Sequence, residues 1–211
     1  GEVEACGNAA RCVGAMLMAE AEAEQVSFHT GAGLIHARAA AGGGVTVDIG
    51  PARTAWADIP LAREMDTAHL PLGAGVLTDA CAVNVGNPHA VFFVADVDAI
   101  DMATLGPQLE TDALFPERAN ITAAQVIDQG AVRIRVWERG VGLTRACGTA
   151  ACATIVAAHG RGLMARAGVV HLPGGDLHVA WRADGHVEMT GPTATSFTGV
   201  VEIADLSRGA A

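Results

Sequence analysis

Apolar and polar positions follow the same order twice along this chain. An Ala-rich apolar stretch without Pro covers residues 11–24, and a second covers residues 152–167. Each is followed by short alternating runs on either side of a Gly-rich segment, a pattern typical of a β-hairpin. Helical spacing of apolar residues predicts a helix in each Ala-rich stretch. The apolar positions behind this prediction are Val13, Leu17 and Met18 in the first stretch and Ile155, Val156 and Leu163 in the second.

The two copies also agree in their letters and spacing. Residues 5–10 read Ala-Cys-Gly-Asn-Ala-Ala, and residues 146–151 read Ala-Cys-Gly-Thr-Ala-Ala. In both copies the Gly of a closing Gly-Pro pair follows the Cys by 44 positions. An internal repeat of this length predicts one structural unit made twice. We expect a Cys-Gly turn, a helix, a strand, a Gly-rich hairpin turn and a second strand in each copy, with a pseudo-twofold site between them.

Further elements are predicted between the copies. Apolar runs at 82–85, 90–94 and 132–137 indicate strands, and residues 100–109 indicate a helix. The chain therefore reads as α/β (α+β) with mostly antiparallel strands in two similar halves. Its 211 residues fit one large or two small domains.

Composition excludes several kinds of function. Half of the chain (51%) is apolar and 17% is charged, which allows a sizeable core. A net charge of −10 without a basic run argues against nucleic acid and against an anionic membrane as partners. All 13 basic residues are Arg. Because Arg cannot form an imine, the absence of Lys excludes a pyridoxal phosphate Schiff base and a Schiff-base aldolase, and it also excludes a P-loop lysine.

The apolar runs and the cysteines of the chain bear on its localisation and on metal binding. The apolar runs fall short of the ~20 residues that span a bilayer, and none opens the chain as a signal peptide does. Five Cys without such a signal lead us to expect reduced thiols in the cytoplasm. Their spacings do not match the pairs that hold zinc, so we expect no metal. The first residue is Gly1, from which we expect a fragment or processed form.

Cys6 and Cys147 are the strongest chemical candidates. Each precedes a Gly at a predicted helix start, where unpaired N–H groups and the helix dipole lower the pKa of a thiol and attract an anion. A buried Cys is otherwise a common small apolar residue, but the symmetric placement of two favours a function. Cys12, Cys152 and Cys81 are predicted to lie in the core.

Polar residues at the ends of apolar runs are further candidates. His89, behind Pro88, suits a base or a hydrogen-bond partner, although a single His is more often structural. Glu138 and Arg139 suit the two charged ends of an amino acid; the alternative is a surface ion pair.

Taken together, the motifs resemble those of the diaminopimelate epimerase family. The resemblance covers essentially the whole chain, in order. Its motifs are Ala5-Cys6-Gly7-Asn8-Ala9-Ala10-Arg11-Cys12, Gly86-Asn87-Pro88-His89, Phe115-Pro116-Glu117-Arg118-Ala119-Asn120, Trp137-Glu138-Arg139-Gly140-Val141-Gly142, Ala146-Cys147-Gly148-Thr149, Leu172-Pro173-Gly174-Gly175 and Met189-Thr190-Gly191-Pro192.

The family resemblance implies two pseudosymmetric domains, each a mixed, mostly antiparallel sheet curled around a central helix. The first domain would comprise residues 1–52 with 193–211, and the second residues 53–192. It also implies a cofactor-independent, two-base enzyme that interconverts LL- and meso-diaminopimelate in bacterial lysine and cell-wall synthesis. A proline or hydroxyproline racemase of the same superfold is the nearest alternative, and a non-catalytic binding protein is another. The oligomeric state stays open, with a homodimer among the alternatives.

The resemblance assigns site residues by position. Cys6 and Cys147 would be the catalytic pair, and His89 and Glu138 would tune their protonation. The implied substrate contacts are Gly7, Asn8, Asn87, Asn120, Glu138, Arg139, Gly148 and Thr149. Ala9 and Leu143 depart from the usual Gly and Glu of the family, and a family segment that precedes the first Cys has no counterpart here.

Overall fold

A computed structural model describes residues 7–31 and 33–200. Its helices are α1 (Gly7–Glu20), α2 (Met102–Glu110) and α3 (Gly148–Gly160), with a 3-10 turn at Ala41–Gly43. Its strands are β1 (Gln25–Thr30), β2 (Gly33–Ala39), β3 (Val45–Pro51), β4 (Leu70–Ala74), β5 (Leu77–Asn84), β6 (Pro88–Phe93), β7 (Asn120–Asp128), β8 (Ala131–Glu138), β9 (Gly142–Thr144), β10 (Ala167–Leu172), β11 (Gly175–Trp181) and β12 (His186–Gly191).

The predicted repeat is confirmed by the order and pairing of the elements. Helix α1 is followed by the antiparallel strands β1, β2 and β3, and α3 is followed by β10, β11 and β12 in the same arrangement. Strands β3 and β12, the last of each copy, pair antiparallel with Asp48 opposite Glu188. The two copies are therefore joined through equivalent strands, as expected for a local two-fold relation.

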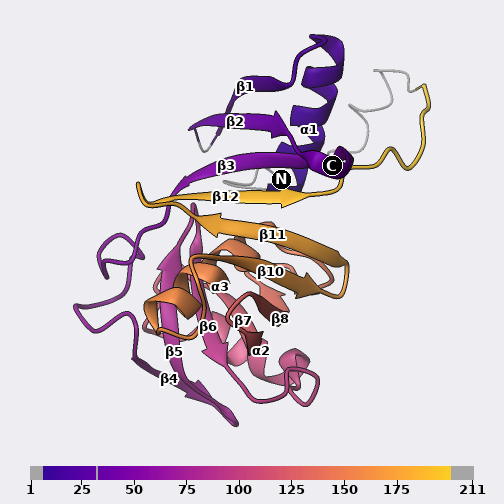
Figure 1. Cartoon of the computed structure of the whole chain (residues 1–211). Coiled ribbons are helices and arrows are strands. Elements are labelled where there is room, and N and C mark those ends of the chain that lie inside the picture. Colours follow the sequence, from indigo (N-terminus) through magenta and orange to yellow (C-terminus); the bar gives the residue numbers. More distant parts are fainter. Residues whose placement is uncertain (1–6, 32, 201–211) are drawn as a thin grey trace.

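The strands form one continuous sheet, of which the two copies make one part (Figure 1). Its order is β1-β2-β3-β12-β11-β10-β8-β7-β6-β5-β4, with β9 on the edge of β8. Most neighbouring pairs are antiparallel, while β6–β7 and β10–β8 are parallel. The expected α/β (α+β) class with a mixed, mostly antiparallel sheet is confirmed. The division into domains at residues 52 and 192 stays a prediction.

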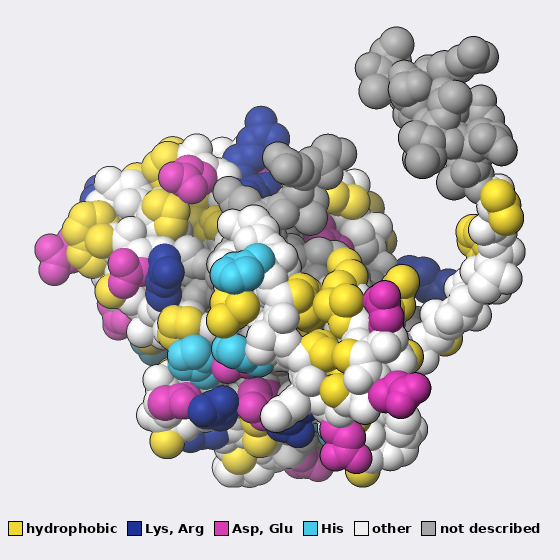
Figure 2. Space-filling view, turned by 90° about the horizontal axis from the view of Figure 1, so that it is seen from above, with side chains coloured by type: hydrophobic (Ala, Val, Ile, Leu, Met, Phe, Trp, Pro, Cys, Tyr) yellow, Lys and Arg dark blue, Asp and Glu magenta, His cyan; other side chains and the backbone are white. Residues whose placement is uncertain are grey.

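The two repeated helices differ in how far they are buried. Helix α3 is buried from Gly148 to Ala158, because strands β5–β7 contact it as well as β10–β12. Helix α1 contacts β1–β3 and is buried on one face only. At the α1 end of the molecule, apolar side chains lie among charged ones on the surface (Figure 2), and Val13 and Met16 of α1 are 40% and 71% exposed.

The prediction that Cys12 lies in the core is wrong, whereas Cys81 and Cys152 are buried. Cys12 follows Cys6 by six positions, while Cys152 follows Cys147 by five. One extra residue turns a side chain by about 100° around a helix, so Cys12 points to the exposed face of α1.

Other boundaries differ from the prediction. Helix α1 ends at Glu20 and α3 at Gly160, earlier than the Ala-rich stretches end. Leu163 therefore lies in the turn after α3 and is 39% exposed. Strand β7 was not predicted, because its Ala-rich, buried centre lacks an alternating pattern. None of the helices within residues 7–31 and 33–200 has the length and apolarity needed to cross a membrane.

Candidate active site

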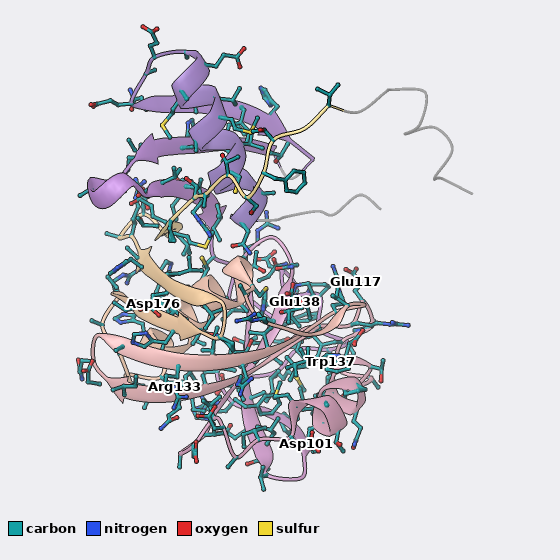
Figure 3. All side chains as sticks on the ribbon, turned by 90° about the vertical axis from the view of Figure 1, so that its right-hand side faces the viewer. Asp101, Glu117, Arg133, Trp137, Glu138 and Asp176 are labelled. Carbon is teal, nitrogen blue, oxygen red and sulfur yellow. The ribbon has the colours of Figure 1, made fainter. Side chains whose placement is uncertain are left out.

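Polar candidates gather at one edge of the sheet. Strands β6 and β7 are parallel and begin together, with His89 opposite Asn120. Strand β8 runs the other way, so its end at Glu138 reaches the same edge. The Asn120 side chain links the three strands: its Nδ2 donates to the carbonyl of Pro88 (3.1 Å), and its Oδ1 accepts the N–H of Arg139 (3.0 Å). Figure 3 shows Glu138 at this same edge, which lies toward helix α1.

Cys147 is the residue that directly precedes helix α3. It is 5% exposed, and its Sγ lies 3.4 Å from Oγ1 of Thr149. Burial, and then the charge of Glu138, raise the pKa of this thiol to about 12. The prediction of a pKa near neutrality is wrong for Cys147, since the N–H of Ala150 and the Thr149 hydroxyl lower it by less than burial raises it. The side chain is a neutral thiol.

Glu138 lies close enough to Cys147 for its charge to raise the thiol pKa. Oε1 of this carboxylate accepts a hydrogen bond of 2.5 Å from the hydroxyl of Thr144 on β9. Thr144 was not singled out in the sequence; its place shortly after Glu138 in a short hairpin was the available signal. Nη1 of Arg139 donates a hydrogen bond to the carbonyl of Glu117 (3.0 Å).

His89 is fully buried at the start of β6. Its Nε2 lies 2.8 Å from Oδ1 of Asn87, and because an amide oxygen only accepts, Nε2 carries the proton. Burial, together with the charge of Arg139, lowers the pKa of His89 to about 3. The imidazole is neutral at pH 7 and orients Asn87. Its predicted effect on the cysteines stays a prediction.

The first half contributes the start of helix α1. Cys6 lies outside the described residues, and α1 begins at the next residue, Gly7. A Cβ atom added to Gly7 would lie 3.9 Å from the Cα of Gly148, so the first turns of α1 and α3 meet. Asn8 accepts a hydrogen bond on Oδ1 from Nη2 of the buried Arg11 (3.1 Å), a second residue that the sequence did not single out.

A cavity of about 580 Å³ opens beside this meeting point. Gly7 and Thr149, one from each helix start, line it together with Gly86, the residue before Asn87. Apolar residues of β1 and β2 complete much of the wall. The cavity thus brings predicted substrate contacts from both copies to one volume.

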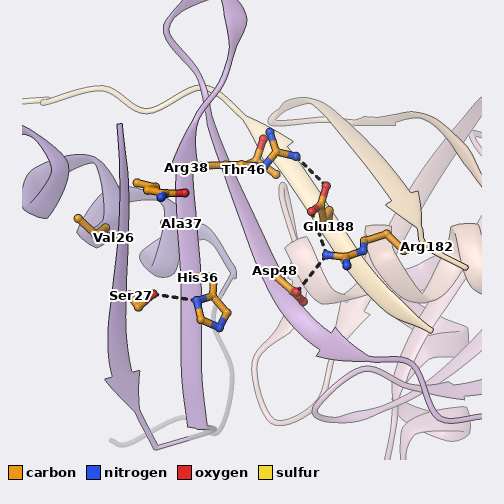
Figure 4. A pocket seen from close by; sticks show the side chains of 10 residues that line it. Val26, Ser27, His36, Ala37, Arg38, Thr46, Asp48, Arg182 and Glu188 are labelled. Carbon is orange, nitrogen blue, oxygen red and sulfur yellow. Dashed lines mark hydrogen bonds and ion pairs between the residues drawn. The ribbon is translucent and has the colours of Figure 1, made fainter. Parts of the chain in front are cut away.

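A second cavity, of about 500 Å³, lies over β1–β3 and β12 (Figure 4). Its charged side chains neutralise one another: Arg38 pairs with Glu188 (2.7 Å), and Arg182 lies 3.6 Å from Asp48. Among the described residues that line it, none is a predicted site residue. The first cavity is therefore the one associated with the candidate chemistry.

The fold is shared with a probable proline racemase and with a putative phenazine biosynthesis protein. A probable proline racemase from Agrobacterium radiobacter K84 matches with a TM-score of 0.64 and 16% identity, over 95% of this chain and 68% of that one. A putative phenazine biosynthesis PhzC/PhzF protein from Clostridium difficile matches with a TM-score of 0.67 and 14% identity, over 96% and 75%. At these identities the likeness shows the fold.

Sequence comparisons identify the family. The family described as diaminopimelate epimerase matches residues 81–195. A diaminopimelate epimerase from Rhodospirillum centenum is 56% identical over 94% of this chain and 68% of its own length, and one from Erythrobacter litoralis is 55% identical over 98% and 75%. The chain belongs to the diaminopimelate epimerase family and is an isomerase of the epimerase type. These relatives favour the epimerase over the racemase alternative.

Proposed function

We propose that this protein interconverts LL- and meso-diaminopimelate with two cysteines and without a cofactor. The observation that carries the proposal is the meeting of two repeated helix starts, at Gly7 and Gly148, each directly after a Cys. Inversion of a carbon centre through a planar carbanion needs a base on one face and an acid on the other. A duplicated half-site is suited to supply both.

The proposed reaction consists of two proton transfers, one on each face of the α-carbon. One cysteine thiolate takes the α-proton as the Cα–H bond breaks, and the electron pair stays on the planar carbanion. The other cysteine thiol gives its proton to the opposite face, so the two residues exchange protonation states. Burial keeps the thiol of Cys147 neutral, which suits the acid role. Cys6 is the proposed base in the direction of reaction in which Cys147 donates its proton.

The residues around the thiols would hold the substrate. Main-chain N–H groups at the starts of α1 and α3 suit the α-carboxylate and the charge that develops as the proton leaves. Glu138 would tune the proton of Cys147, and the neutral His89 would act through Asn87. The proposed substrate contacts are those named in the sequence: Gly7, Asn8, Asn87, Asn120, Glu138, Arg139, Gly148 and Thr149.

The test is a direct stereochemical assay. The purified protein is incubated with LL-diaminopimelate, and the product is resolved by chiral chromatography, with L-proline and trans-4-hydroxy-L-proline as matched substrates. We expect meso-diaminopimelate to form without added cofactor and the two imino acids to stay unchanged. Racemisation of an imino acid with no reaction of diaminopimelate would contradict the proposal.

A further inference from the structure

We propose that Glu110 is a positioning residue, which holds the turn that carries Glu138 and Arg139. The inference rests on the proposed roles of those two residues in epimerisation. Glu110 is the last residue of α2 and is 6% exposed, and no contact among the described residues joins it to Cys147. What it does contact is the chain immediately around the candidate site.

The two carboxylate oxygens of Glu110 accept hydrogen bonds from the end of β8 and from the turn that follows it. Oε2 accepts the indole N–H of Trp137 (2.7 Å), and Oε1 accepts the main-chain N–H of Gly140 (3.0 Å). Nη1 of Arg118 lies 3.5 Å from Oε1 on the solvent side. The residues before Glu138 and after Arg139 are thus fixed to one buried group.

Helix α2 is shaped to receive this turn. A Cβ atom added to Gly106 would lie 2.5 Å from Cγ of the Trp137 ring, so the indole lies directly against the helix backbone. Gly106 and Glu110 are four residues apart and share one face of the helix. The ring is held at its face by Gly106 and at its nitrogen by Glu110.

The place of this carboxylate is not favoured by its charge. A buried negative charge is costly, and the end of a helix, where the dipole is negative, is an unfavourable place for it. An apolar residue would avoid that cost, but it would leave the N–H groups of Trp137 and Gly140 without these acceptors. The carboxylate instead supplies two directed acceptors, which define where the turn lies.

Further hydrogen bonds hold the same turn from within and from the side of Asn120. Gly140 adopts a positive φ of 73°, and the turn closes with the N–H of Val141 donating to the carbonyl of Glu138 (3.0 Å). Asn120 holds the Arg139 N–H from the other side. Without Glu110, we infer that the turn shifts and takes the Glu138 carboxylate away from Cys147.

The first measurement is structural and independent of activity. The chain has three Trp, and Trp181 donates its indole N–H to the carbonyl of Gly185 (3.1 Å), which makes it an internal control. In nuclear magnetic resonance spectra, Glu110→Ala should move the indole resonance of Trp137, assigned with Trp137→Phe, and leave that of Trp181 in place. The Gly140 amide should exchange about tenfold faster. Unchanged Trp137 and Gly140 signals would overturn the proposal.

The second measurement is kinetic. Glu110→Ala and the volume-conserving Glu110→Gln should lower kcat/KM for diaminopimelate by about 10- to 100-fold, with a raised KM, because Glu138 and Arg139 are displaced. Met102→Ala, at the opposite end of α2 and 3% exposed, is a destabilising control that leaves the turn intact. It should change kcat only by its folded fraction and leave KM as in the natural protein.

The two proposals fail in different ways. An inactive natural protein would contradict the proposed function, while the resonance measurement would still decide whether Glu110 holds the turn. Both Glu110 variants could instead have the kcat and KM of the natural protein while the Trp137 signal moves. That result would show that the position of the turn does not matter for catalysis, and it would overturn the positioning role.

Discussion

Gly7 and Gly148, the first residues of α1 and α3, lie so close that a Cβ atom on Gly7 would be 3.9 Å from the Cα of Gly148. Both pack on the same side chain: an added Cβ would be 2.3 Å from Cε of Met189 at Gly7 and 2.9 Å from its Sδ at Gly148. Met189 lies on β12 and is fully buried. The two copies of the repeat therefore meet at three residues in contact, next to the proposed thiols.

Gly7→Ala should destabilise the protein by about 1 kcal/mol, because the new methyl group displaces the end of the buried but flexible Met189 side chain. Urea unfolding followed by fluorescence measures this cost. Gly160→Ala is the matched control, since a Cβ there meets nothing within 4 Å. An equal cost at both glycines would show that the contact with Met189 is not responsible.

The same contact predicts coupling between Gly7 and Met189. Met189→Ala removes the overlapping atoms, so Gly7→Ala should cost less in that background than in the natural protein. A double-mutant cycle of unfolding free energies gives the coupling directly. Additive costs would mean that the two residues do not oppose each other.

The buried, neutral His89 should lower the free energy of unfolding of the protein in acid. Because burial lowers its pKa in the folded state to about 3, the unfolded chain binds more protons between about pH 6.5 and pH 3. The free energy of unfolding should therefore fall as pH falls through this range, by up to about 1.4 kcal/mol per pH unit from this residue. His89→Gln should flatten that slope in urea unfolding between pH 7 and pH 4, whereas above pH 7 the two proteins should differ by a constant amount. An unchanged slope would contradict a neutral, buried His89.

The rate at which Cys147 is alkylated should depend on pH in an unusual way. The thiolate is the reactive form, and burial raises the pKa of this thiol to about 12. Alkylation by iodoacetamide should reach the exposed Cys12 first, and the rate at Cys147 should keep rising about tenfold per pH unit up to pH 10. Peptide mass mapping of timed samples gives each rate. A plateau at Cys147 near pH 7 would restore the activated thiol that its helix position suggests.

Local patterns in the sequence predict much of this structure, and the exceptions have physical causes. The repeated letters predict both copies of helix and hairpin, because these elements depend on local spacing and glycines. The burial of Cys147 depends on the packing of β5–β7 against α3, which no local pattern records, so its pKa was predicted in the wrong direction. Glu110 was missed for a similar reason: its partners, Trp137 and Gly140, lie about 30 residues away along the chain.

The last prediction concerns how Cys6 and Cys147 divide the reaction. Cys6→Ser and Cys147→Ser should each nearly abolish epimerisation, because the pKa of a serine hydroxyl is far too high for a base here. Each variant keeps one thiol, which faces one side of the α-carbon. Each should therefore still exchange the α-proton with deuterium from solvent for one stereoisomer, and the two variants should prefer opposite stereoisomers.

A one-base mechanism, in which a single Cys serves both faces of a rotating intermediate, predicts a different result. One variant would then be silent and the other nearly normal. Mass spectrometry of deuterium uptake, measured separately from LL- and meso-diaminopimelate, distinguishes the two mechanisms, with Cys12→Ser as the control because Cys12 is exposed on α1. Equal exchange of both stereoisomers by either variant would contradict one thiol on each face, because a fixed thiol reaches the proton on one side of the carbon only.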